Sequence, residues 1–152
     1  MKHALVALAV VSFAGSAFAQ SVKEKKARTA VDEKFTESTA AVKDCGKSFK
    51  FVYDWKSFDA MDFKKQGREK MDQYGSEVSN FDVFGAGINK LCEDKDYKEA
   101  LSKVTTIVYK PTANDSITVK ATVAANTLTI ENYSFGSTRD ASDYAGAAKD
   151  AL

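Results

Sequence analysis

Three aspartates beside the chain's single tryptophan come closest, by type and spacing, to a catalytic group. Asp54, Asp59 and Asp62 flank Trp55. Paired carboxylates are the apparatus of enzymes that hydrolyse glycosidic bonds, and an aromatic ring beside an acid suits a sugar site. However, no spacing specifies which acids would meet, and helix starts carry acids for their dipole. A carboxylate-dependent hydrolase of cell-wall polysaccharide is therefore the alternative function, and we assign no catalytic residue.

Other catalytic and cofactor-binding patterns are missing from the sequence. His3 is the single histidine and lies in a segment that we expect to be removed, so the mature chain cannot build a Ser-His-Asp triad or a histidine-ligated metal site. Gly85-Ala86-Gly87 lacks the strand and third glycine of a dinucleotide site. The acidic run Glu93-Asp94-Lys95-Asp96 lacks the glycine and final glutamate of an EF-hand loop. We expect no cofactor and no metal, and a non-enzymatic role is favoured.

Residues 1–19 predict a secretory signal peptide. Lys2 provides the positive start, residues 4–14 an apolar centre, and Ala17-Phe18-Ala19 the small-x-small pattern of a cleavage site. The apolar centre is shorter than the ~20 residues that span a bilayer, and no later stretch is apolar for long enough. Cleavage after Ala19 would leave residues 20–152 as a single domain, periplasmic or secreted, without a transmembrane segment.

The expected compartment gives the two cysteines a role. Cys45 and Cys92 are the only cysteines, and in an oxidising environment such a pair predicts one structural disulfide. Without Lys2, the 22 basic residues become 21, which equals the 21 acidic residues. Because a nucleic-acid binder needs a basic surface to neutralise phosphates, this balance excludes nucleic acid as the expected partner.

An aromatic run lies just before the aspartates. Every second residue from Phe49 to Trp55 is aromatic, and in a strand Phe49, Phe51, Tyr53 and Trp55 would share one face. This face could be buried, which is favoured because large aromatics carry much of a small core, or it could be an exposed platform for a sugar or a partner. Phe51, Trp55 and Phe58 also fit helical spacing. Tyr53 and Trp55 are the candidate binding residues.

Hydrophobic periodicity predicts the elements that would position these residues. Helices are expected over 21–44, 58–74, 79–92, in a short segment from Asp96, and from 137 or 138 to 152. Strands are expected over 105–110, 117–123 and 127–135. If Ala124 faces Thr127 across a turn, one face of the last two strands is apolar and the other pairs opposite charges, as a half-buried sheet requires.

The sequence thus predicts an α+β fold: N-terminal helices, an aromatic strand, a three-stranded antiparallel β-meander, a short C-terminal helix and one disulfide. The leading function is that of a small exported, soluble binding or interaction protein of the cell envelope. Its partner would be an envelope protein or glycan, contacting the aromatic strand or the exposed sheet face. A carrier of a small apolar ligand is a further class, which an apolar cavity of about 300 Å³ or more would favour.

Overall fold

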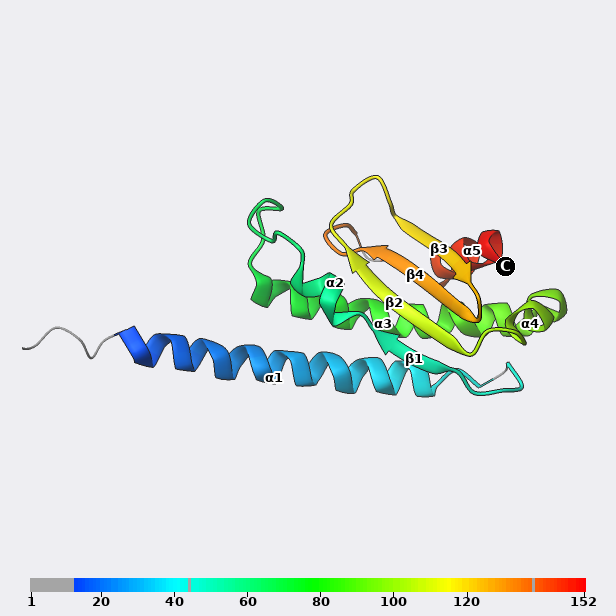
Figure 1. Cartoon of the computed structure of the whole chain (residues 1–152), viewed down its shortest axis with the longest axis horizontal. Helices are drawn as coiled ribbons and strands as arrows, with labels where there is room; N and C mark the ends of the chain where they lie inside the picture. Colours follow the sequence, from blue (N-terminus) through cyan, green and yellow to red (C-terminus); the bar gives the residue numbers. More distant parts are fainter. Residues whose placement is uncertain (1–12, 44, 138) are drawn as a thin grey trace, which may run out of the picture.

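The computed structural model describes residues 13–43, 45–137 and 139–152, with residues 13–20 described through their backbone alone. The elements follow in the order α1 (Phe13–Ala40), β1 (Lys50–Tyr53), α2 (Trp55–Asp59), α3 (Lys70–Glu93), α4 (Lys95–Leu101), β2 (Thr106–Thr112), β3 (Val119–Ala124), β4 (Thr127–Tyr133) and α5 (Ala141–Ala151) (Figure 1). Among the described residues, no helix is long and apolar enough to cross a membrane.

The expected signal peptide lies largely outside the described residues. Residues 1–12 are not described, and residues 13–19 form the first turns of α1. Its removal, and with it the export of the protein, stays a prediction.

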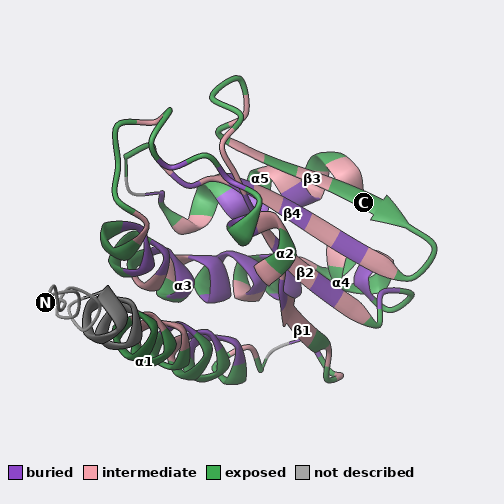
Figure 2. Cartoon of the chain, turned by 60° about the vertical axis from the view of Figure 1, so that its left-hand side comes forward, coloured by how far each residue is buried: buried purple, intermediate pink, exposed green. Residues whose placement is uncertain are grey.

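The long helices form a layer on one face of a four-stranded mixed sheet (Figures 1 and 2). α3 lies in the middle of this layer and packs against both α1 and α5. The strands alternate between buried and partly exposed residues, and Ile107, Tyr109, Leu128 and Ile130 point into the core and are fully buried. The inner face of β2 is therefore made by Ile107 and Tyr109.

The prediction of a three-stranded antiparallel meander is wrong. The strand order is β1-β2-β4-β3, in which β1 pairs with β2 and β2 pairs with β4 in parallel, while β3 is antiparallel to β4. β4 carries fully buried Leu128 and Ile130 and takes an interior position, whereas β3 is exposed along most of its length and forms an edge. Edge positions tolerate charged residues such as Lys120, so the polarity of β3 explains its place.

The predicted register of the β3–β4 hairpin is confirmed. Ala124 faces Thr127, and Lys120 faces Glu131. The turn between them has Ala125 at a φ of 52°, and the carbonyl of Asn126 accepts hydrogen bonds from the amides of residues 105 and 106 at 2.8 and 3.2 Å. The hairpin turn thereby holds the start of β2 beside the start of β4, which makes these two strands parallel.

Helix boundaries differ from the expected ones where capping side chains decide them. Asp54 accepts a hydrogen bond from the Ser57 amide and starts α2 at Trp55, which ends the aromatic strand at Tyr53. The helix expected over 58–74 is therefore wrong: α2 is short, turns follow, and α3 begins at residue 70. α4 begins after Asp94 instead of Asp96. The C-terminal helix is present and starts with a capping box at Asp140.

Two glycines of α3 allow close helix packing. A Cβ at Gly85 would lie 2.5 Å from the backbone oxygen of Ser38 on α1. A Cβ at Gly87 would lie 2.7 Å from the Cβ of Tyr144 and 2.9 Å from the oxygen of Ala141, both on α5. The Gly85-Ala86-Gly87 sequence therefore lets α3 approach a helix on each side.

Candidate functional site

A groove of about 380 Å³ lies beside the aromatic strand, between α1 and β1, and is here called the α1–β1 groove. Its volume lies in the range of small-molecule sites. Its walls come from the last turns of α1, the segment that follows α1, and the first half of the aromatic run. The lining residues are Phe35, Thr36, Thr39, Ala40, Val42, Ser48, Phe49 and Phe51.

Aromatic rings give the groove an apolar and rigid floor. Phe35 is almost fully buried, and its ring lies 5.1 Å from Phe81 and 6.1 Å from Phe84 on α3. Phe51 is half-buried and lies edge-on to Phe84 at 6.4 Å and to Phe49 at 6.0 Å. The floor is thus continuous with the core, while Phe49 and Phe51 keep part of their rings exposed.

Hydroxyl groups supply the polar part of the groove. Thr36 and Thr39 donate hydrogen bonds to backbone carbonyls of α1, each over 2.8 Å at its shortest, so their oxygens keep lone pairs that can accept. The hydroxyl of Ser48 makes no hydrogen bond with any residue that the structure describes and can donate. A few polar groups on an apolar surface are typical of sites that orient a ligand.

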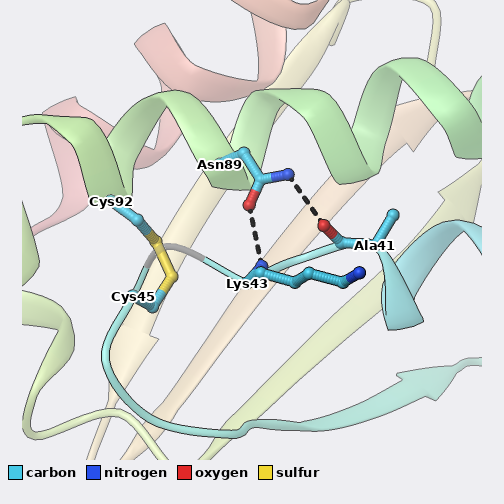
Figure 3. The surroundings of a disulfide bond; sticks show 5 residues. All are labelled: Ala41, Lys43, Cys45, Asn89 and Cys92. Carbon is cyan, nitrogen blue, oxygen red and sulfur yellow. Dashed lines mark hydrogen bonds between the residues drawn. A yellow bond between two sulfur atoms is a disulfide. The ribbon is translucent and has the colours of Figure 1, made fainter.

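The segment that follows α1 is linked to α3 by side-chain hydrogen bonds and by a disulfide, which leave α3 about one helical turn apart (Figure 3). The side chain of Asn89 donates to the carbonyl of Ala41 and accepts from the amide of Lys43, both over 3.1 Å. Cys45 and Cys92 form the predicted disulfide, with their Cα atoms 4.5 Å apart. The groove is therefore held in shape by the protein itself, which reduces the ordering cost of binding.

Three lysines are sequence neighbours of lining residues. Lys43 follows Val42, Lys47 precedes Ser48, and Lys50 lies between the two exposed rings. The Lys47 ammonium donates to the carbonyls of residues 102 and 104 over 2.7 Å and lies 5.5 Å from the centre of the Phe49 ring. Lys43 and Lys50 are exposed. Lys50 pairs with Thr106 and Phe51 pairs with Ile107, so the Lys50 side chain lies on the sheet face opposite to the Phe51 ring. Lys43 and Lys47 are therefore the lysines beside the groove, although the chain as a whole is nearly neutral.

The candidate binding residues Tyr53 and Trp55 lie away from this groove. Tyr53 is buried and stacks on Tyr109 at 5.7 Å. Trp55 is half-buried, its Nε1 donates to Asp32 over 2.8 Å, and the guanidinium of Arg28 lies 4.5 Å from its ring centre. Both rings therefore have intramolecular partners. Their assignment as binding residues stays a prediction, and their contacts favour a structural role.

The three aspartates of the hydrolase hypothesis are engaged separately. Asp54 caps α2, and Asp62 accepts a hydrogen bond from the amide of residue 65 over 3.1 Å. Asp59 bonds to Arg28 and to Lys70, the latter over 3.0 Å. Partial burial raises the pKa of Asp59, but the hydrogen bonds from these two cations outweigh it and hold the pKa below its ordinary value. Asp59 therefore stays ionised and cannot serve as a general acid at neutral pH.

Glu77 on α3 is a fully buried carboxyl that the sequence did not single out. Burial raises its pKa from 4.5 to about 7 against the opposing effects of Ser134, Gln73, Tyr53 and Tyr109. Gln73 donates to Oε1 over 3.4 Å, whereas Oε2 has no hydrogen-bond partner among the described residues. No described cation pairs with it, so desolvation dominates the shift in pKa.

The raised pKa of Glu77 links stability to pH. The folded state favours the protonated form, so the contribution of this group is fully present below pH 4.5 and is lost as the pH rises through about 7. The corresponding decrease in the free energy of unfolding is about 3 kcal/mol. Because its side chain is inaccessible to solvent, Glu77 cannot contact a substrate in this conformation.

The sequence singled out the aromatic run that includes Phe49 and Phe51 but named Tyr53 and Trp55 as the binding residues, and it gave no indication of the α1 side of the groove. The alternation at Phe49 and Phe51 pointed to one wall, but Thr36, Thr39 and Ala40 carry no signal that separates them from other residues of a polar helix. Within the described ranges, no group of three or more His, Cys, Asp or Glu side chains gathers to hold a metal ion. Comparison of the chain with protein-family models, curated proteins and solved structures gives no match in any of the three.

Proposed function

We propose that this chain is a small exported binding protein that takes an apolar group, from a small ligand or a partner, into the α1–β1 groove. The observation that carries the proposal is the groove itself: about 380 Å³, with aromatic rings on its floor and hydroxyls in its walls. It combines two of the hypotheses drawn from the sequence, the aromatic strand as a contact surface and the apolar cavity as a binding site.

Two other candidate surfaces lack aromatic rings at a hollow. The sheet face opposite the helices carries threonines and the ion pair of Lys110 and Glu131, whose charged atoms lie 2.5 Å apart, so it offers little apolar surface. A second hollow of about 480 Å³ lies between α1 and α2, where Glu24 and Asp59 form ion pairs with Arg28 and Lys70. The hydrolase alternative gains no support, because the pKa values of Glu24 and Asp59 are both lowered.

Fluorescence of N-phenyl-1-naphthylamine, an uncharged aromatic probe that brightens in apolar surroundings, tests the proposal with the oxidised protein isolated from the periplasm. Ala40 lines the groove and is exposed, so Ala40→Phe would fill the groove without removing a core contact. Ala86→Phe is the matched control, because Ala86 is an exposed helical alanine of α3. We expect Ala40→Phe to weaken probe binding at least about tenfold and the control to change it less than about twofold.

Thermal melts of both variants separate loss of the site from loss of the fold. If Ala40→Phe does not fold, Thr36→Phe, which enters the groove from the preceding turn of α1, takes its place. Equal probe binding by the original chain and a folded groove-filling variant would refute the assignment of the groove. Absence of probe binding to the original chain would refute it as well.

A further inference from the structure

The α1–β1 groove borders a sheet edge with open hydrogen-bonding groups. β1 is the first strand in the order β1-β2-β4-β3, and among the described residues β2 is its one neighbouring strand. The amides of Lys50 and Asp54 donate to carbonyls of residues 105 and 109 on the β2 side, each over 2.9 Å. Because main-chain groups alternate in direction along a strand, those of Phe51 and Tyr53 point to the opposite, unpaired edge.

This edge and the groove are parts of one surface. Phe51 contributes its ring to the groove and its main chain to the free edge of β1, while α1 supplies the facing wall. A helix beside an unpaired strand, with a pocket between them, is the arrangement in which an extended peptide can add to a sheet. The main chain provides affinity in that mode, and a side chain in the pocket provides specificity.

The opposite edge of the sheet lacks these features. β3 is exposed along most of its length. Lysines occur on both edge strands, Lys120 on β3 and Lys50 on β1, so charge does not separate the edges, but β3 residues line neither the α1–β1 groove nor the hollow between α1 and α2. The two edges therefore differ, and β1 is the one suited to a partner.

On the basis of the proposed function, we infer that the groove binds an extended peptide segment of another exported protein. This segment adds to β1 as a fifth strand. One large apolar side chain of this segment enters the α1–β1 groove. Acidic residues on either side of it lie near Lys43 and Lys47, whose positive charges beside the groove complement them. The partner is thus a peptide with an aromatic or large aliphatic anchor and acidic flanks.

The palindromic peptide Ac-Glu-Thr-Val-Phe-Val-Thr-Glu-NH2 tests this inference by competing with N-phenyl-1-naphthylamine on the oxidised protein. Two derivatives carry N-methyl groups, either on both valines or on both threonines. The valine amides and the threonine amides point to opposite sides of the extended peptide. Strand addition therefore uses one of these two sets as hydrogen-bond donors to β1 and leaves the other set free. We expect one derivative to lose at least about tenfold in affinity and the other less than about threefold.

Hydrogen exchange provides the readout on the protein side. Addition of the parent peptide should slow exchange of the Phe51 and Tyr53 amides at least about tenfold and leave exchange along the free edge of β3 unchanged. A peptide with alanine in place of the central phenylalanine should bind at least about tenfold more weakly, because it lacks the anchor.

The outcomes distinguish the two proposals. If the fluorescent probe binds the groove and both methylated peptides compete equally, or no peptide competes, strand addition is refuted and the groove remains a site for a small apolar ligand. If the probe does not bind, the proposed function fails whatever the peptides do. Slower exchange at β3 in place of β1 would refute the choice of edge.

Discussion

Replacing Gly85 with alanine tests the close packing of α1 on α3. The added Cβ would lie 2.5 Å from the backbone oxygen of Ser38 and 3.3 Å from its carbonyl carbon. Main-chain atoms cannot rotate away, so α1 must move as a unit or α3 must bend. Gly75 is the matched control, because it lies in the same helix and a Cβ there would meet nothing within 4 Å.

The magnitude follows from two opposing contributions. Alanine is favoured over glycine in a helix interior by about 1 kcal/mol, which both substitutions gain. Overpacking costs about 1–3 kcal/mol, which only Gly85→Ala incurs. Because the helix propensity cancels between the variants, the free energy of unfolding of Gly85→Ala should lie about 1–3 kcal/mol below that of Gly75→Ala. For a chain of this size that difference corresponds to about 3–9 °C in Tm.

Urea unfolding followed by the fluorescence of Trp55, the single tryptophan, measures both free energies, and circular dichroism gives both Tm values. Gly75→Ala should be more stable than the original chain, and Gly85→Ala should be the less stable variant of the two. Equal stability of the two variants would refute the packing of α1 on α3 at Ser38. It would also remove the support for the α1 wall of the groove.

Three further variants test the core, the disulfide and the aromatic cluster. Glu77→Gln should abolish the loss of stability between pH 5 and 8 and stabilise the protein by up to about 3 kcal/mol at pH 8 in urea titrations; an unchanged pH profile would contradict the burial of Glu77. Cys45→Ser combined with Cys92→Ser should lower the free energy of unfolding by about 4 kcal/mol and weaken probe binding; unchanged affinity would show that the disulfide does not shape the groove. Trp55→Ala should cost about 2–4 kcal/mol by circular dichroism and leave probe binding within about twofold, whereas lost binding in a stable variant would restore Trp55 as a binding residue.

Local patterns in the sequence predicted those parts of the fold that local chemistry determines. The β3–β4 register follows from a two-residue turn and from side chains that face one another, such as Lys120 and Glu131, and it is confirmed. The disulfide of Cys45 and Cys92 is likewise confirmed. The position of β2 between β1 and β4 could not be predicted from local patterns. It depends on which strands have a neighbour on both edges, and that is a property of the whole sheet.

The helix starts show a second limit of sequence reasoning. Ser57 and Asp54 are both suitable caps, and the choice between them decides whether Trp55 extends a strand or starts a helix. In the folded chain Asp54 is the cap, since the amide and hydroxyl of Ser57 both donate to it over 3.1 and 2.7 Å. The alternating aromatic run is consequently divided between a strand and a helix, and its four rings do not form a single platform.

This division gives the aromatic run two roles. Its second half, Tyr53 and Trp55, packs with Phe58 between the sheet and the helices, where large rings bury the most surface. Its first half, Phe49 and Phe51, stays partly exposed because α1 ends at Ala40 and the following segment turns away toward Cys92. The disulfide and the Asn89 hydrogen bonds direct that turn, so the cross-link that stabilises the fold also keeps the groove open. The structural disulfide and the proposed binding site therefore depend on the same few residues after α1.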